Sequence, residues 1–245
     1  LLQKSISLIF KIFFRKKKSI IIFQNRNDLN VFNSKIKSNI KKKIVKGSGI
    51  DSNIFQPKNN KDLNKIQILL PARILYDKGV EDFIYCAIKT KKKFKNYVDF
   101  VIAGKIDTHN PSSIPLEVIN KYCKEGIIIW LSNVSNIKTV YDKSHIICFP
   151  SFREGNPRSL LESACCKLPI IAYDVAGCND IIINNYSGIL VPFRDKNKMN
   201  NSLEALILDS NLRNFLGENA RKHVIANFSN QIIFKHYLEI WKQLI

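Results

Sequence analysis

Two glutamates in the stretch SFREGNPRSLLESACCKLPIIAYD (residues 151–174) could act on the same ligand, because Glu154 and Glu162 are separated by only seven residues. Glu154 lies in a polar turn before a proline, and Glu162 lies in a run with helical spacing. A carboxylate accepts two hydrogen bonds at once, so these acids could bind the hydroxyls of a sugar and of a ribose diol. Simpler roles fit equally well: an i,i+4 pair of Glu162 with Arg158, worth roughly 0.2–0.5 kcal/mol, and a helix-dipole contact for Glu154.

Two cations, Arg73 and Lys78, lie in the segment ARILYDKG (72–79), directly after an apolar run. The planar guanidinium of an arginine can bridge phosphate oxygens, and the ammonium of a lysine acts as a mobile point charge. The pair therefore suits a diphosphate. The alternative is ordinary loop charge in a lysine-rich chain.

A helix is expected to begin at Pro157, because proline suits a first helical position and Asn156 is a good cap. The first backbone N–H groups of that helix belong to Arg158, Ser159 and Leu160, and they have no partner within the helix. If these groups face the ends of the strands, they add a second site for an anion beside the two cations.

Apolar runs of strand length alternate with segments of helical spacing from residue 66 onward. The predicted strands are 66–72, 97–104, 127–131, 146–150 and 169–174, and the predicted helices are 79–94, 115–126, 135–144 and 157–168. This alternation predicts right-handed βαβ units and a doubly wound, Rossmann-like α/β domain with a parallel sheet. Ligands of such domains bind at the carboxyl ends of the strands, near a topological switch point. The residues that follow the strands should converge there: Arg73, Lys78, Gly104, Ser132, Asn133, Glu154 and Glu162.

The two ends of the chain differ from this pattern. Residues 1–46 hold a basic amphipathic segment, a predicted strand at 19–24, a predicted helix from Asp28 to about Ile40 and a short strand at 42–46. They resemble the closing elements of a larger domain, and Leu1 is not a methionine, so we expect a fragment or a processed product. Residues 47–229 are then the main domain, and 230–245 a closing helix.

Composition narrows the classes of partner. The net charge of +19, from 39 Lys and Arg against 20 Asp and Glu, fits an anionic partner, but a coding bias toward lysine, asparagine and isoleucine would give the same charge. No nucleic-acid motif occurs, and no apolar run reaches the roughly 18 residues of a membrane span. The six cysteines form no CxxC pair and the four histidines have no ligand spacing, so we expect core thiols, a reducing cytosol and no metal site.

The segment PSFREGNPRSLLESACCKLPIIAYDVAGCNDII (150–182) closely resembles the signature of the retaining glycosyltransferases of family 4, which have the GT-B fold. Those enzymes carry a glutamate, seven residues and a second glutamate, here Glu154 and Glu162. Further matching segments follow in the same order: GSGIDSNIF (47–55), ARILYDKGVEDFI (72–84), AGKID (103–107) and NNYSGILVP (184–192). The resemblance covers roughly residues 19–245.

This resemblance implies a site for a nucleotide-sugar donor. Arg73 and Lys78 would grip the diphosphate, and the backbone at Ser159 and Leu160 would face the phosphates. Glu162 would hold the ribose hydroxyls. No metal or other cofactor is then required, because the cations and amides neutralise the departing diphosphate.

The resemblance also implies how the transferred sugar is held. Glu154 would contact that sugar, with the turn of Gly155, Asn156 and Pro157 beside it, so that Glu154 joins the two cations as a catalytic residue. Ser132 stands where family members often carry glycine, which leaves the identity of the base open.

The implied function is a transferase that moves a sugar, UDP-linked in the first instance, to a lipid-linked or polysaccharide acceptor with retained configuration. Such an enzyme would work in the cytoplasm, on the inner face of the membrane. One alternative is a donor-binding fragment that is inactive because the acceptor half is missing. Another is a basic peripheral module that binds an anionic membrane surface through KIFFRKKK (11–18) and IKSNIKKK (36–43).

Overall fold

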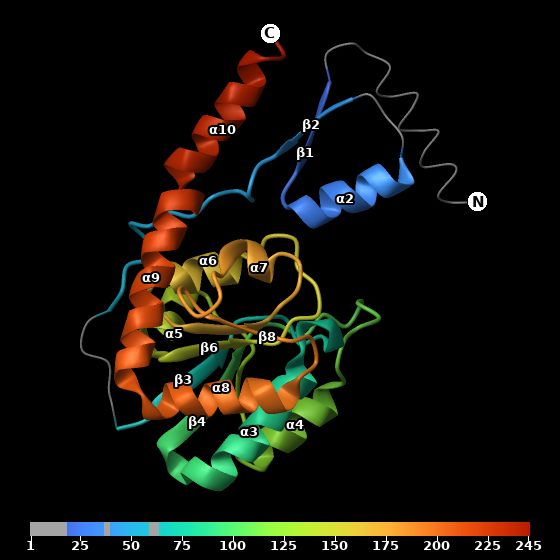
Figure 1. The fold of residues 1–245 in the computed structure, drawn as a ribbon. Helices are drawn as coiled ribbons and strands as arrows, with labels where there is room; N and C mark the ends of the chain where they lie inside the picture. The colour runs from blue at the N-terminus through green and yellow to red at the C-terminus, as the bar shows by residue number, and fades with distance from the viewer. Residues whose placement is uncertain (1–18, 37–39, 59–63) are drawn as a thin grey trace.

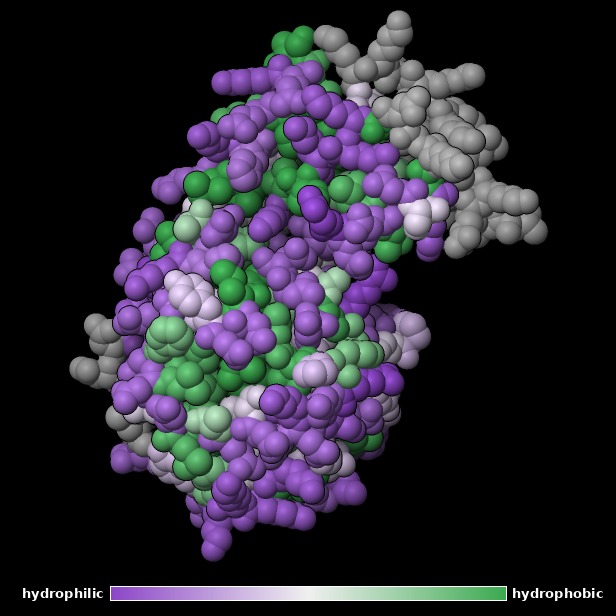
Figure 2. Space-filling model, in the orientation of Figure 1, coloured by the Kyte–Doolittle hydropathy of each residue, from purple (hydrophilic) through white to green (hydrophobic). Residues whose placement is uncertain are grey.

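The computed structural model describes residues 19–36, 40–58 and 64–245. The segment KIFFRKKK and part of IKSNIKKK lie outside these ranges. The described chain forms a larger α/β domain and a smaller N-terminal unit, and the last helix runs from the one to the other (Figure 1). Figure 2 shows mostly hydrophilic residues on one face, with smaller hydrophobic areas between them.

A six-stranded sheet forms the centre of the larger domain, and each pair of neighbouring strands is parallel. Its strands are β3 (Ile66–Leu70), β4 (Val98–Ala103), β5 (Ile129–Leu131), β6 (Ile146–Phe149), β7 (Ile170–Tyr173) and β8 (Ile189–Val191), in the order β5-β4-β3-β6-β7-β8. The expected doubly wound α/β fold is confirmed, and each of the five predicted strands is present. β8 was not predicted as a strand, because three apolar residues give too short a pattern to recognise.

Helices cover both faces of the sheet, as the strand order requires (Figure 1). They are α3 (Val80–Phe94), α4 (Leu116–Lys124), α5 (Ile137–Lys143), α6 (Arg158–Cys165), α7 (Cys178–Ile181), α8 (Lys196–Leu208) and α9 (Ser210–Phe228), with short 3-10 turns at η1 (Tyr76–Lys78) and η2 (Lys95–Tyr97). The four helices predicted between the strands are present. In the described ranges, no helix combines the length and the apolar composition that a membrane-spanning helix needs.

The core explains why the apolar runs become strands. β3, β6 and β7 are buried almost throughout, and β6 and β7 have no residue that faces solvent. Such continuous apolar strands are typical of a parallel sheet covered on both faces. Five of the six cysteines are buried and all six are free, so the predicted core thiols are confirmed except for Cys123, which is half-buried.

The N-terminal unit is a small βαβ arrangement. β1 (Ile20–Phe23) pairs in parallel with β2 (Lys41–Ile44), and α2 (Arg26–Lys35) connects them. The predicted helix from Asp28 to about Ile40 is therefore misplaced at both ends, because the Asn25 side chain caps α2 two residues earlier and the chain is extended at Ile36.

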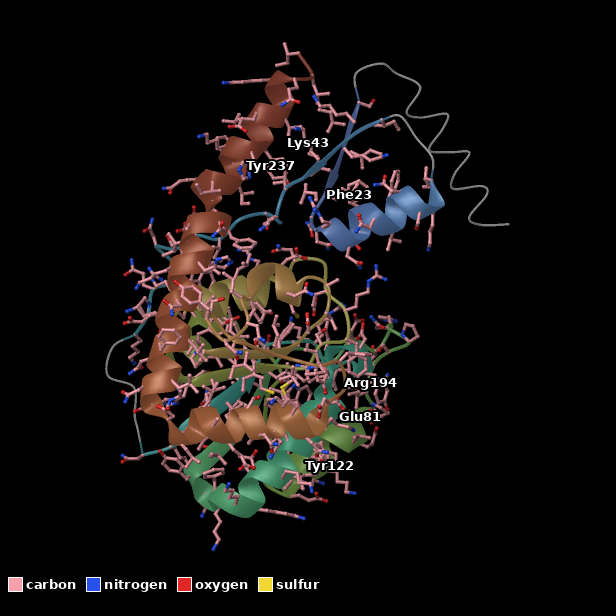
Figure 3. The ribbon with its side chains drawn as sticks, viewed as in Figure 1. Phe23, Lys43, Glu81, Tyr122, Arg194 and Tyr237 are labelled. Carbon is pink, nitrogen blue, oxygen red and sulfur yellow. The ribbon has the colours of Figure 1, made fainter. Side chains whose placement is uncertain are left out.

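The closing helix α10 (Asn230–Lys242) reaches from the larger domain to this unit. Ile233 and Ile240 pack against Val45 in a second small core. Tyr237, labelled on α10 in Figure 3, donates from its hydroxyl to the carbonyl of Gly47 over 3.5 Å. α10 therefore ties the two parts of the described chain together.

Candidate functional site

The strand order places a topological switch point between β3 and β6. These strands are neighbours in the sheet, and the chain leaves them toward opposite edges: from β3 to β4 and from β6 to β7. In such sheets the connections diverge and leave a crevice at the carboxyl ends of the two strands. Arg73 and Lys78 follow β3, and Glu154 follows β6. These residues therefore lie in the loops at the carboxyl edge of the sheet, where the sequence pattern placed them.

Lys78 and Glu154 meet at this crevice. The Lys78 Nζ lies 2.7 Å from the Glu154 Oε1, and the two side chains are only 18% and 10% exposed. Ser151, the second residue after β6, donates from its hydroxyl to the same carboxylate oxygen over 2.7 Å. Sequence reasoning missed Ser151, although its position just beyond a predicted strand was a usable signal. The three side chains form a compact polar cluster with a cation beside a carboxylate.

Two glycines fix the loops that carry this cluster. Gly79 has φ +69°, and a Cβ at this position would lie 1.9 Å from the carbonyl oxygen of Pro150. Gly177 has φ +82°, and a Cβ there would lie 2.7 Å from the carbonyl oxygen of Glu154. Both positions need glycine for the left-handed backbone and for the close approach. The segment of Glu154 is therefore clamped between the loop of Lys78 and the turn at Gly177.

Arg73 forms an ion pair with the loop after β4. Its Nη1 lies 2.7 Å from the Asp107 Oδ2, and the Arg73 side chain is 54% exposed. Arg73 therefore pairs with Asp107 of the segment AGKID, which follows β4, and not with Glu154 or Glu162. Arg73 remains at the crevice by its position after β3, but the predicted convergence with the acids holds in the structure for Lys78.

The start of α6 differs from the prediction. Pro157 occupies the cap position with ψ 107°, Arg158 is the first helical residue, and no side chain caps the helix. The Leu160 amide donates to the carbonyl of Pro157 over 3.0 Å, so it is not free as predicted. Among the described residues, the amides of Arg158 and Ser159 have no acceptor. Two of the three amides predicted to be free at this helix start are therefore free, and the third is not.

Asn156 is not the cap that was predicted. Its Nδ2 is buried and makes no hydrogen bond to a described residue. Its Oδ1 lies so close to Gly47 that a Cβ on that glycine would be 2.7 Å away. The Asn156 side chain therefore lies against the segment GSGID and does not cap α6. Gly155, the neighbour of Asn156, accepts a hydrogen bond from the Asn25 Nδ2 over 3.0 Å, so the N-terminal unit contacts this turn.

Glu162 lies one turn into α6 and is buried, and both of its carboxylate oxygens have partners. The Arg158 Nε lies 3.0 Å from Oε1, and the Tyr141 hydroxyl lies 3.1 Å from Oε2. The simpler i,i+4 role is therefore present. Burial raises the pKa of Glu162 above its ordinary value of 4.5, against the opposing effect of hydrogen bonds from Tyr141 and Arg158. Tyr141 was not predicted, because in the sequence it looks like an ordinary apolar residue of a helix.

A cavity of about 500 Å³ opens between β5 and α5. Its walls include Trp130, Ser132, Asn133, Asn136 and Thr139. Ser132 and Asn133 were predicted at this edge because they follow the third strand. Leu131, Val134 and Val140 also line the cavity, so it combines apolar surface with a few polar side chains, as a site for a planar group requires.

Within the described ranges, no three His, Cys, Asp or Glu side chains gather into a group that could hold a metal ion. The loops and the helix start at the carboxyl edge of the sheet carry a lysine, an arginine, two free amides and two carboxylates. Such groups can bind an anion and hydroxyls.

Comparison with known proteins identifies related chains. The family model described as "Glycosyl transferases group 1" matches residues 51–223, well over half of the chain. The chain is 29% identical over 98% of its length to the N,N'-diacetylbacillosaminyl-diphospho-undecaprenol alpha-1,3-N-acetylgalactosaminyltransferase of Campylobacter jejuni, of which it covers 64%. It is 25% identical over 93% of its length to the UDP-Gal:alpha-D-GlcNAc-diphosphoundecaprenol alpha-1,3-galactosyltransferase of Escherichia coli, of which it covers 62%. It thus spans less than two thirds of each relative.

The fold has solved counterparts. The structure of Anabaena HepE in complex with UDP superimposes with a TM-score of 0.85 over 99% of this chain and 68% of that chain, at 15% identity. At that identity the likeness concerns the fold, which extends through both the larger domain and the N-terminal unit.

Proposed function

This chain belongs to the family of glycosyl transferases group 1, and from that premise we propose that it supplies the donor site of a glycosyltransferase. The donor is a nucleoside-diphosphate sugar bound at the switch point between β3 and β6. The observation that carries the proposal is the contact of Lys78 with Glu154 in that crevice, at 2.7 Å and largely shielded from solvent.

The diphosphate is the part of the donor that most needs these residues. As the sugar is transferred, negative charge collects on the departing diphosphate, and fixed positive groups lower the barrier. Lys78 can turn from Glu154 to the phosphate, Arg73 can release Asp107, and the amides of Arg158 and Ser159 can donate at the start of α6. The Leu160 amide already donates to the carbonyl of Pro157, so Leu160 helps to shape this turn and does not bind the phosphate through its amide. This set makes a metal ion unnecessary for the transfer.

The sugar lies beside Glu154. Once Lys78 turns to the phosphate, the Glu154 carboxylate keeps the hydrogen bond from Ser151 and can accept from sugar hydroxyls. Gly155, Asn156 and Pro157 form the wall of this part of the site. The unpartnered Nδ2 of Asn156 is a donor that a sugar oxygen can satisfy after a small rotation of the side chain.

The nucleoside extends in the other direction, with its ribose at Glu162 and its base in the cavity between β5 and α5. We assign UDP as the nucleotide, because the name of the E. coli relative specifies a UDP-linked sugar and the HepE structure contains UDP. The acceptor is a lipid-linked diphosphate, since the names of both relatives specify a diphospho-undecaprenol. The configuration at the transferred carbon is retained, in line with the resemblance to the retaining glycosyltransferases of family 4.

Titration calorimetry with UDP tests the donor site on the chain as it stands. Lys78→Met should weaken UDP binding about 10-fold or more, because a charge-assisted contact to phosphate is worth about 1.5–3 kcal/mol. Lys124→Met is the matched control: it removes the same charge from an exposed position of α4 and should leave the affinity unchanged. Equal affinities for all three proteins would contradict the proposed site, as would an absence of UDP binding.

Location at a membrane follows from a lipid-linked acceptor. The net charge of +19, together with Lys41, Lys42 and Lys43 on β2, supports attraction to an anionic inner leaflet in the cytoplasm. Sedimentation with phosphatidylglycerol vesicles should recover the protein at low salt and release it as ionic strength rises. Equal recovery with phosphatidylcholine vesicles would contradict an electrostatic attachment.

The chain covers less than two thirds of each of the two relatives. This favours a second hypothesis, in which the chain binds the donor but transfers nothing by itself. Donor binding and transfer are therefore measured separately. Binding of UDP without product formation from a diphospho-undecaprenol acceptor would support the second hypothesis. Product formation would support a chain that is an active transferase.

A further inference from the structure

We propose that Tyr141 is a positioning residue that holds the carboxylate of Glu162 in the orientation needed to bind both ribose hydroxyls of the nucleotide. This inference rests on the proposed function, because it concerns how the ribose is recognised at that site. Neither the sequence pattern nor the family signature pointed to Tyr141.

Tyr141 is held rigidly. It lies on α5 and is fully buried, with the ring of Phe55 edge-on at 6.2 Å between centroids. Its hydroxyl donates to the Glu162 Oε2 over 3.1 Å and lies 3.4 Å from the carbonyl oxygen of Ser159. A buried hydroxyl cannot reach a ligand in the crevice, so any effect of Tyr141 on binding passes through Glu162 and the first turn of α6.

The two partners of Glu162 are unequal. Tyr141 is fixed in the core, whereas the Arg158 side chain is 68% exposed and can change rotamer. The fixed partner therefore determines the plane of the carboxylate, and the arginine follows it. Loss of the arginine contact leaves the orientation in place, but loss of the phenol leaves a carboxylate that can rotate about its last bond.

Counting acceptor positions explains why both partners are compatible with ribose. A carboxylate offers about four lone-pair positions, two on each oxygen. Tyr141 uses one position on Oε2, and Arg158 uses one on Oε1. One position then remains on each oxygen, which is the pattern that two neighbouring hydroxyls require. The ion pair that seemed to compete with ribose binding therefore leaves room for it.

The electrostatics support the same role. Burial raises the pKa of Glu162, and the hydrogen bond from Tyr141 opposes that rise by stabilising the charged carboxylate. Burial and the nearby carboxylate in turn raise the pKa of Tyr141 well above its ordinary value, so the phenol keeps its proton. The donor in this pair is thus always the tyrosine, which leaves the acceptor positions of Glu162 available to the ligand.

The experiment compares UDP with 2′,3′-dideoxy-UDP by titration calorimetry on the full chain. The unmodified protein should bind UDP about 10- to 100-fold more tightly, because the dideoxy nucleotide lacks the two hydroxyls that would donate to the remaining acceptor positions of the Glu162 carboxylate. Tyr141→Phe keeps the ring and removes only the hydroxyl. It should reduce this ratio about 3- to 10-fold through weaker UDP binding, with little change in the affinity for the dideoxy nucleotide.

The dideoxy nucleotide is the internal control for structure. A Tyr141→Phe protein that loses affinity equally for both nucleotides would show a general packing effect and overturn the inference. An unchanged ratio in Tyr141→Phe, combined with a lost ratio in Glu162→Gln, would also overturn it while leaving the ribose role of Glu162 intact. A ratio near one in the unmodified protein would refute the assignment of Glu162 to ribose, and this inference with it.

Discussion

The ion pair of Lys78 and Glu154 gives the most informative prediction, because it should serve both the resting fold and the bound donor. Lys78→Met keeps most of the length of the side chain and removes its charge. The variant leaves Glu154 with one donor, the Ser151 hydroxyl at 2.7 Å, in a position where the carboxylate side chain is only 10% exposed. Stability and donor binding should both fall, but for different reasons.

The loss of stability can be bounded from the exposure of the pair. Removing one partner of a fully buried ion pair costs about 3–5 kcal/mol, and an exposed pair contributes about 0–1 kcal/mol. The Lys78 side chain is 18% exposed and Ser151 still binds the same oxygen, so Lys78→Met should lower the free energy of unfolding by an intermediate amount, about 1.5–3 kcal/mol. Urea denaturation followed by circular dichroism measures this difference.

A double variant separates the two roles of Lys78. Lys78→Met with Glu154→Gln replaces the charged pair by neutral groups, so most of the lost stability should return. Donor binding should not return, because the phosphate still lacks its lysine. In the complete enzyme, loss of one preorganised charge should lower turnover about 10²–10³-fold. A single variant with unchanged stability and unchanged UDP affinity would refute the reasoning about this cluster.

Three further predictions follow from the same site. Gly177→Ala should lower the free energy of unfolding and weaken UDP binding, whereas Gly126→Ala, with φ +68° but no atom within 4 Å of the added Cβ, should cost only about 1 kcal/mol, the backbone strain alone. Equal effects of these two alanines would contradict the clamp on Glu154. Because burial raises the pKa of Glu162 in the folded state, its ionisation lowers stability as pH rises from its ordinary value of 4.5 through the raised value, and the loss persists above it. Glu162→Gln should remove this fall while weakening UDP binding, and a pH profile of unfolding that is unchanged in the variant would count against it. Transfer by the complete enzyme should continue in excess EDTA, and a loss that Mg²⁺ restores would contradict the metal-free site.

Much of the fold follows from the sequence because each buried strand carries its own local signal. β6 and β7 are continuous apolar runs between helices, and a parallel sheet is the arrangement that buries such runs on both faces. The edge of the sheet that holds Lys78 and Glu154 follows from this topology alone. β8 has only three residues, which is too little pattern to separate a strand from a loop.

The rest depends on contacts between elements that are distant in sequence. Tyr141 and Glu162 are 21 residues apart, and nothing local marks the hydroxyl of one as the partner of the other. The pairing of Arg73 with Asp107 depends in the same way on how two neighbouring loops pack. The cap of α6 failed as a prediction for a local reason: propensity favoured Asn156, but the extended backbone at Pro157 moved the start of the helix by one residue.

A crystal structure of this chain with bound UDP tests the donor site most directly. We expect the diphosphate within hydrogen-bond distance of the Lys78 Nζ and the Ser159 amide, with both ribose hydroxyls on Glu162. A diphosphate bound elsewhere, with Lys78 still paired to Glu154 and no contact between ribose and Glu162, would contradict it.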